Sequence, residues 1–386
     1  MENTISQDLA STEMDQILST PSTDNSTEIV DDTSYSQFIT PSLHNGSDQQ
    51  CNFFVPSQYI SNFIPAVYSV IFILGYIGNS VVIAFLCHRS HLKTVANIYI
   101  INLAIADLVF LSTLPIWAVY NATGYSWHFG SVMCKICSSL VSLNLYASIY
   151  FIMCMSIDCY MAILHPFGSQ SKRTLCHVHC VIILVWSLAL VATFPAIYFQ
   201  SAHYIEKMGN TVCEMVYPPS NANHWSAAMS LMENTLGFFI PFTVIGTCYS
   251  FVAYHLMRIE VPEKNKCKRD KALWMVIAVV LAFFICWLPF HVLTFMDALS
   301  RLNFIADCQT ITMIKIAMPI ANCLGFANSC INPFIYCFLG DHFQVQLCDK
   351  AQRGPSRLYS RGSSSTRISN PSHKNCDTGC IDLNNL

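Results

Sequence analysis

Five polar side chains fall inside long apolar stretches of this chain, where oxygen atoms are costly unless they bind something. Asp107 lies in the second stretch, and a buried carboxylate at such a depth indicates a functional site more often than a purely structural one. The other four supply amide and hydroxyl oxygens from two further stretches: Asn144, Ser148, Asn328 and Asn332. Hard cations prefer oxygen ligands of these kinds. The set predicts a site for a regulatory sodium ion, and no other cofactor is expected.

Two proline motifs interrupt the sixth and seventh apolar stretches. Residues 286–289 read Cys-Trp-Leu-Pro, and residues 332–336 read Asn-Pro-Phe-Ile-Tyr. Proline removes a backbone hydrogen bond, and the Asn and Tyr of the second motif are costly in lipid unless they face other helices. Trp287 alone would indicate core packing, but the two motifs in this order favour a bundle that changes shape.

Patterns for catalysis are absent from the sequence. The chain lacks HExxH, GxSxG and P-loop motifs, so we predict that it is not an enzyme, and no nucleic-acid partner is expected. Residues 176–180 read Cys-His-Val-His-Cys, and three of these side chains share one helix face. Structural zinc normally takes a fourth ligand and loop-spaced pairs. A hydrated helix end is therefore favoured over a metal site.

The elements that carry these residues are predicted to span a membrane. Hydrophobic residues make up 53% of the 386 residues and charged residues 11%, well below the roughly 25% of soluble domains. Each apolar run exceeds the roughly 20 residues that cross a bilayer as a helix. The seven runs cover residues 62–87, 95–119, 131–163, 176–199, 226–257, 272–299 and 309–339. The predicted fold is an all-α membrane protein, a seven-transmembrane helix bundle surrounded by membrane lipid.

Charge gives the orientation. Residues 1–50 contain nine acids and no Lys or Arg. If the N-terminus is outside, 16 of the 20 cations fall in cytoplasmic segments, as the positive-inside rule requires. The outer side keeps Lys135, Lys207, Arg301 and Lys315. The chain is expected to be a multi-pass protein of the plasma membrane with an extracellular N-terminus.

Three regions follow from this topology. Residues 1–60 form an outer tail with glycosylation sequons at Asn25 and Asn45, residues 61–340 form the bundle, and residues 341–386 form a cytoplasmic segment. Phe343 and Leu347 are four residues apart, as in a short amphipathic eighth helix at the membrane surface. The remaining tail is rich in Ser, Arg and Asn and is predicted to be disordered.

Four cysteines fall on the outer side under this topology. They are Cys51, Cys134, Cys213 and Cys308. An even number in an oxidising compartment indicates two disulfides, with three possible pairings.

The chain resembles a rhodopsin-like G-protein-coupled receptor over about residues 50–350. The resemblance rests on marks in all seven stretches: Gly78-Asn79, Asp107, Trp127-His128-Phe129-Gly130, Cys134, Trp186, Pro241, Tyr249 and the two proline motifs. It implies disulfides Cys134–Cys213 and Cys51–Cys308. Long runs at residues 279–299 and 324–330 also resemble the angiotensin II receptors, their type 2 branch above all.

Carried over position by position, that resemblance implies a peptide pocket. Its aromatic and acidic lining would be Trp117, Tyr120, Tyr125, Trp287, Phe290, His291, Asp297 and Phe326. Asp297 would pair a ligand cation. Three charged positions depart from the family pattern, with Gln200 in place of an arginine, Glu233 in place of a lysine and Lys315 in place of an acid. Because the lysine meets the anionic end of the peptide, we expect angiotensin II to bind weakly or in another register.

A fourth departure lies at the cytoplasmic end of the third stretch, which reads Asp158-Cys159-Tyr160. The family has an arginine where Cys159 stands, which pairs the preceding acid at rest and reaches the G-protein when the receptor opens. Cysteine is short and uncharged, so it can do neither. Higher basal opening and poor G-protein engagement are the two expectations, and poor engagement is favoured. The rest of the expected switch is Tyr249, Asn332, Pro333 and Tyr336.

The resulting prediction is a receptor for a small peptide hormone of the angiotensin II type, which signals to a heterotrimeric G-protein or an arrestin-like partner by helix rearrangement. The alternative is a peptide-binding decoy or scaffold with little G-protein coupling, because of Cys159. Receptor dimers are left open as a further partner class. The sequence leaves the peptide and the G-protein subtype unidentified.

Overall fold

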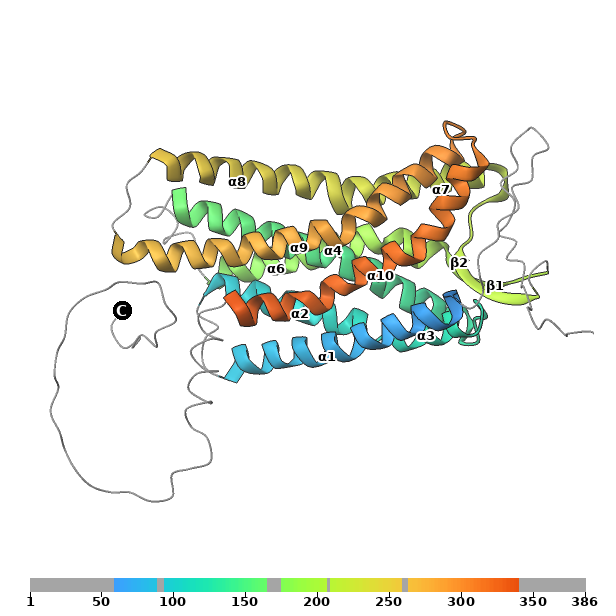
Figure 1. The fold of residues 1–386 in the computed structure, drawn as a ribbon, viewed down its shortest axis with the longest axis horizontal. Coiled ribbons are helices and arrows are strands. Elements are labelled where there is room, and N and C mark those ends of the chain that lie inside the picture. Colours follow the sequence, from blue (N-terminus) through green and yellow to red (C-terminus); the bar gives the residue numbers. More distant parts are fainter. Residues whose placement is uncertain (1–58, 89–93, 165–174, 207–208, 259–262, 340–386) are drawn as a thin grey trace, which may run out of the picture. The chain divides into compact units, whose positions relative to one another are not determined.

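The structure is a computed structural model that describes residues 59–88, 94–164, 175–206, 209–258 and 263–339. Figure 1 labels its α-helices and strands. The helices are η1 Tyr59–Phe63, α1 Ile64–His88, α2 Val95–Leu111, α3 Leu114–Ala122, α4 Gly130–Leu164, α6 Leu175–Phe199, η3 Pro219–Asn221, α7 Ala222–Asn234, η4 Thr235–Phe239, α8 Ile240–Arg258, α9 Glu263–Arg301 and α10 Cys308–Leu339. The strands are β1 Gln200–Ile205 and β2 Asn210–Met215.

Seven helical segments of the described chain are long and apolar enough to cross a membrane, which confirms the predicted bundle. Their bounds agree with the seven predicted runs at most ends. The largest difference is the fifth span, which begins at Pro219, about seven residues before the predicted start at 226. The cause is the polar helix α7 (residues 222–234), whose Asn and Glu side chains hide it from a hydropathy scan.

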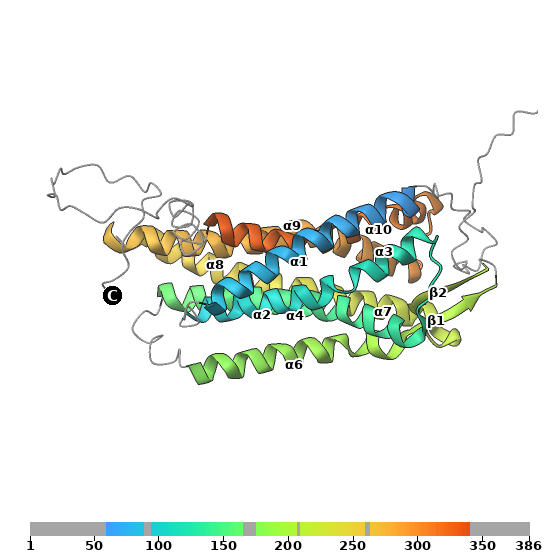
Figure 2. The same cartoon turned by 90° about the horizontal axis from the view of Figure 1, so that it is seen from below.

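Helix α4 holds the bundle together. It contacts α2, α6, α8 and α9, while α10 packs against α9 and α1. Figure 2 shows α2 and α4 running side by side between α1 and α6. The buried face of α4 includes Asn144, Ser148 and Ser156 besides its apolar side chains. A helix surrounded by other helices keeps such polar groups away from lipid.

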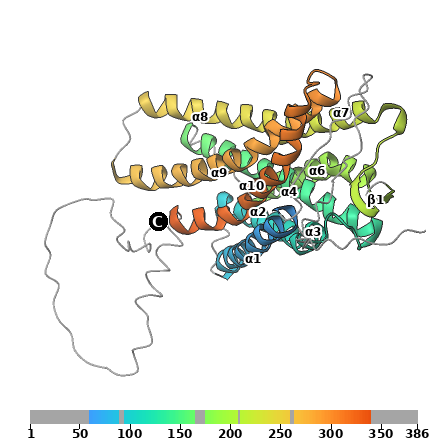
Figure 3. The same ribbon diagram turned by 45° about the vertical axis from the view of Figure 1, so that its right-hand side comes forward.

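Prolines interrupt two spans in the halves that are predicted to lie toward the outer side. The second span is interrupted between α2 and α3 at Ser112 and Thr113, just ahead of Pro115. The fifth span widens into the single π turn η4, which ends two residues before Pro241. Figure 3 shows α7 and α8, the two α-helices on either side of this turn. In both places proline lacks the N–H that would continue the hydrogen-bond ladder.

An antiparallel hairpin of β1 and β2 joins the fourth and fifth spans, a feature that the sequence analysis did not predict. Ala202 pairs with Cys213 in its register, and Gly209, the residue just before β2, has φ of 65°. Glycine adopts this left-handed conformation without a steric penalty. A disulfide from Cys213 anchors the hairpin to Cys134 of α4.

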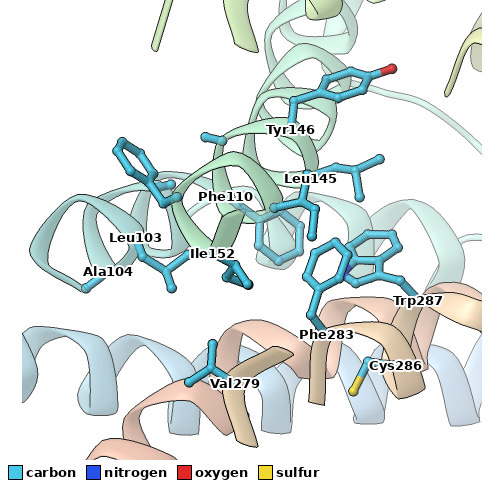
Figure 4. Packing of buried hydrophobic residues seen from close by; sticks show 14 of the residues in the cluster. Leu103, Ala104, Phe110, Leu145, Tyr146, Ile152, Val279, Phe283, Cys286 and Trp287 are labelled. Carbon is cyan, nitrogen blue, oxygen red and sulfur yellow. The ribbon is translucent and has the colours of Figure 1, made fainter. Parts of the chain in front are cut away.

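The apolar core extends through the bundle, and α4 carries a large share of it between α2 and α9. Figure 4 shows Phe283 and Trp287 of α9 beside Leu145 of α4, with Phe110 of α2 nearby. These side chains are almost completely buried. Large side chains packed at this density leave little freedom for one helix to move without its neighbours.

Several predicted features lie outside the described residues. They are the sequons at Asn25 and Asn45, Cys51 and the short amphipathic eighth helix after residue 340.

Candidate functional site

An aromatic cluster on α9 and α10 forms the floor of the outer site, the name used here for the predicted ligand-binding set. The ring of Trp287 lies 5.5 Å from Phe290 and 6.4 Å from Phe326, measured between ring centroids. Phe290 lies 5.4 Å from His291 by the same measure. The structure therefore brings four of the predicted residues together on two neighbouring helices.

Gly325 lets the Trp287 ring lie directly against α10. A Cβ atom at this position would come within 2.9 Å of the Trp287 ring atoms Cε3 and Cζ3. Real Cβ contacts are longer, so any other residue here forces the indole to move. The aromatic floor thus depends on a glycine one residue before Phe326.

A second aromatic group surrounds the end of α3. Tyr120 lies 5.4 Å from Tyr125 and 5.9 Å from Trp117, between ring centroids. Tyr125 has φ of 61°, a left-handed conformation that is rare for a large side chain and is often kept at functional sites. Burial raises the pKa of its hydroxyl to about 12, so Tyr125 stays neutral at physiological pH.

Tyr68 of α1 extends the aromatic floor, although sequence reasoning did not select it. Its ring lies 5.4 Å from that of Phe326. Nothing in the spacing of α1 marks Tyr68, since the contact depends on how α1 packs against α10.

The charged rim of the site is an ion-pair triad. Asp297 accepts a bond of 2.6 Å from Arg301 Nε, one helical turn away, and its other oxygen lies 3.3 Å from Lys315 Nζ of α10. Asp297 was predicted to pair a ligand cation. In the structure two cations of the chain already contact it, so a ligand cation reaches Asp297 only by displacing one of them. The i, i+4 spacing of Asp297 and Arg301 could have revealed the first pair.

Gln200 and Glu233, the other two positions that depart from the family pattern, have different surroundings. Gln200 at the start of β1 is buried, and its amide donates to the sulfur of Cys213 at 3.4 Å. Gln200 therefore supports the hairpin. Glu233 of α7 is half-buried, and the described residues give its carboxylate neither a hydrogen bond nor an ion pair.

Below the aromatic floor lies the inner polar cluster around Asp107. The carboxylate is fully buried and accepts from Asn144 Nδ2 at 2.9 Å, Ser329 Oγ at 2.8 Å and Asn332 Nδ2 at 3.3 Å. Asn144 also donates to Ser148 at 3.2 Å. Four of the five predicted residues are thus joined by hydrogen bonds. Ser329 was missed, although it precedes Asn332 by three residues and so shares its helix face.

The cluster keeps unused oxygen atoms, as a cation site should. The side-chain oxygens Oδ1 of Asn328 and Asn332 are buried and have no hydrogen-bond partner in the described chain. Buried acceptors without partners are costly, and a bound hard cation would satisfy them. The donor set therefore fits sodium.

At the end of the bundle that is predicted to face the cytoplasm, Asp158, Cys159 and Tyr160 occupy the last two turns of α4 and are half-buried. Tyr249 of α8 lies near Ser156 and Cys159 of α4, in agreement with the packing of these two helices. The buried hydroxyl of Tyr336 in α10 has no hydrogen-bond partner in the described chain. The predicted switch residues thus lie on three helices, of which α4 and α8 pack together.

The Cys134–Cys213 disulfide joins the N-terminal end of α4 to β2, with a Cα–Cα distance of 5.7 Å. This confirms the pairing that the resemblance implied. Cys308 also forms a disulfide, while its predicted partner Cys51 lies outside the described residues.

Comparison with known proteins agrees with this arrangement. Residues 78–336 match the family described as 7 transmembrane receptor (rhodopsin family). The chain is 46% identical to the type-2 angiotensin II receptor of Ovis aries over 319 residues, which cover 81% of this chain and 88% of the relative. It is 47% identical to the type-2 receptor of Homo sapiens over 76% of this chain and 80% of the relative. It is 40% identical to the type-1 angiotensin II receptor of Bos taurus over 83% of this chain and 89% of the relative.

The match spans the inner polar cluster, the outer site and both proline motifs, and the relatives are covered over most of their length. These receptors are not enzymes, in agreement with the sequence prediction. The chain belongs to the rhodopsin family of seven-transmembrane receptors.

Proposed function

We propose that this chain is a plasma-membrane receptor for a small peptide hormone of the angiotensin II type, with its N-terminus outside the cell. The proposal is supported by the identity with angiotensin II receptors of both types and by the aromatic outer site. A peptide with aromatic and charged side chains suits this lining.

The contact of Trp287 with α10 carries the proposal. The indole packs against Gly325 and Phe326, and Asn328 and Ser329 of the inner polar cluster follow on the same helix within one turn. A ligand that displaces Trp287 therefore pushes on the segment that contacts Asp107. From there the break at Pro333 lets the cytoplasmic end of α10 move, and a G-protein or an arrestin-like partner would detect the movement.

The inner polar cluster would hold an allosteric sodium ion. Asp107 would supply the negative charge, and Asn144, Ser148, Asn328 and Asn332 the neutral oxygens. The bound ion would link α2, α4 and α10 and so favour the resting bundle.

Competition binding on cells that express the full chain tests the receptor function. We expect a labelled vasoactive peptide of the angiotensin type to bind saturably, and unlabelled angiotensin II to compete at micromolar rather than nanomolar concentration, since Glu233 stands where the family lysine would be. Nanomolar competition would refute weak binding. Absence of saturable binding for every angiotensin-type peptide would refute the assignment itself.

A second candidate function rests on Cys159. Without the arginine of the family pattern, the chain would act as a peptide-binding decoy, internalising receptor or dimer-forming scaffold with little G-protein coupling. The test compares agonist-stimulated nucleotide exchange of the native chain with that of Cys159→Arg. A gain of tenfold or more, on the order of 1.4 kcal/mol, supports the scaffold function. Equal exchange by the two chains supports ordinary coupling.

A further inference from the structure

The outer site carries opposite charges at two levels. Near the outer end of α9, one acid, Asp297, meets the two cations Arg301 and Lys315, which leaves a net positive charge. Further into the bundle, Glu233 is an acid for which the described residues provide no cation. The rim therefore favours an anion, and the interior favours a cation.

Two close approaches of the fifth span to α9, one from α7 and one from η4, fix the level of Glu233. The neighbouring Asn234 donates from Nδ2 to Thr294 Oγ1 at 3.1 Å. One turn further along, a Cβ atom on Gly237 would lie 3.4 Å from Cε1 of His291. Glu233 is therefore held at the level of Thr294, one turn outward of His291. The same Cβ atom on Gly237 would lie 3.7 Å from Cε1 of Tyr146, so this face of the fifth span also meets α4.

His291 is a second, independent sign of a missing partner. The side chain is only 2% exposed, and neither ring nitrogen has a hydrogen-bond partner in the described part of the chain. A neutral imidazole offers one donor and one acceptor, and leaving both unused in a buried place is costly. A ligand group at this level would satisfy the acceptor nitrogen as well as the Glu233 carboxylate.

We infer that Glu233 and His291 form a subsite for a cationic group of the ligand, an ammonium or a guanidinium. Both groups carry several N–H donors and no acceptor, which matches a carboxylate beside an imidazole acceptor. Trp287 and Phe290 add aromatic faces that attract cations. The inference rests on the proposed peptide-receptor function and names the chemistry of its ligand.

The ion-pair triad at the rim sets the orientation of the ligand in the site. Thr294, Asp297 and Arg301 follow one another at three- and four-residue spacing, so they lie on one stripe of α9. Arg301 is seven residues beyond Thr294, about 10 Å along the helix axis. The ligand would place its base inside and an acidic group about 10 Å outward. This polarity is the reverse of a peptide that enters with its carboxylate first.

Small probes test the subsite without any peptide. The purified full chain is heated in detergent with 2-phenylethylamine or with 3-phenylpropanoate, which share an aromatic ring and differ in charge. We expect the amine, up to about 10 mM, to raise the unfolding temperature with increasing concentration and the acid to leave it unchanged. Glu233→Gln should abolish the effect. Glu206→Gln, which removes an exposed acid of the outer loop, should preserve it.

A paired peptide experiment then measures whether the chain prefers a peptide that ends in a cation or one that ends in an anion. Angiotensin II with a free C-terminal carboxylate is compared with the same peptide as its C-terminal 2-aminoethylamide, which ends in an ammonium group. On the native chain the amine form should bind at least about tenfold more tightly, and Glu233→Lys should reverse that order. Glu206→Lys makes the same change of charge outside the subsite, and it should leave the native order of preference unchanged.

The outcomes separate the two proposals. If the amine probe stabilises the native chain but neither peptide binds, the angiotensin-type assignment fails and the cation subsite stands. If 3-phenylpropanoate stabilises the chain as well as the amine does, or the amine effect is absent or survives Glu233→Gln, the subsite is overturned. The subsite is also overturned if the native chain and Glu233→Lys prefer the same peptide form.

Discussion

The side-chain amide of Asn79 in α1 donates to the backbone carbonyl of Ser329 in α10 at 2.8 Å. Ser329 is four residues before Pro333, so its carbonyl is the one that loses its helical N–H partner to the proline ring. The same amide also donates to Gly75 in its own helix at 2.9 Å. Asn79 thus satisfies the backbone group that the break in α10 exposes, and it ties the break to α1.

Asn79→Ala should therefore destabilise the bundle. It leaves the Ser329 carbonyl buried without a partner, which costs about 1–3 kcal/mol. Asn121→Ala is the matched control, because that buried amide donates only to the Trp117 carbonyl of its own helix. Thermal unfolding of the purified chain should show a clearly larger drop for Asn79→Ala. Equal drops would show that the Ser329 carbonyl finds another partner.

Gly78 gives a second test of the same interface. A Cβ atom there would meet Cβ and Cγ of Pro333 at 3.0 Å, and the proline ring cannot rotate away. We expect Gly78→Ala to destabilise the chain by about 1–3 kcal/mol through overpacking. Gly246→Ala in α8 meets no atom within 4 Å and should be neutral or stabilising, because alanine favours a helix. The argument fails if the two variants unfold at the same temperature.

How much of this could be predicted depends on whether a feature is local. The seven spans could be predicted because each apolar run, as a helix, is long enough to cross a bilayer. The hairpin was missed because β1 contains His203, Tyr204 and other residues that neither alternate cleanly nor fill a hydrophobic strand. The Lys315–Asp297 pair joins residues 18 apart on two helices, and only packing brings them together.

The site shows the same division. The sequence identified Asp107 because a lone acid in an apolar span is costly wherever it packs. The sequence placed Asn328 in the cluster, but in the structure the adjacent Ser329 makes the direct hydrogen bond to Asp107. Neighbouring residues on a helix point about 100° apart. The spacing within one span therefore does not tell which of the two faces Asp107 until the partner helix is known.

Gly325→Ala should displace Trp287. Because the added Cβ would lie 2.9 Å from the indole, the ring must rotate or α9 must move away from α10. Chains labelled with 5-fluorotryptophan have six indole resonances, since the sequence has six tryptophans. We expect the Trp287 signal, assigned with Trp287→Phe, to shift while that of Trp186 on α6 stays in place. An unmoved Trp287 signal would remove the support for the coupling of the outer site to α10.

Sodium should stabilise the chain through Asp107. At constant ionic strength, exchange of N-methylglucamine chloride for sodium chloride is expected to raise the unfolding temperature, because the ion binds only the folded cluster. Asp107→Asn removes the one negative charge of the cluster and should abolish the difference. Asp307→Asn removes an exposed acid at the start of α10 and should leave it intact. A sodium effect that survives in Asp107→Asn would place the ion elsewhere.

The rim triad should respond unequally to loss of its members. Arg301 is the closer partner of Asp297, at 2.6 Å, but it belongs to the same helix, whereas Lys315 at 3.3 Å connects α9 to α10. All three side chains are partly exposed, so each pair is worth at most about 1 kcal/mol. Asp297→Asn leaves two cations facing each other, while Lys315→Gln leaves Asp297 still paired with Arg301. We therefore expect Asp297→Asn to lower the unfolding temperature more than Lys315→Gln does. Adding salt should narrow the gap, because screening weakens the repulsion between the two cations. If Lys315→Gln is the more damaging change, the bridge between the two helices outweighs the balance of charge at the rim.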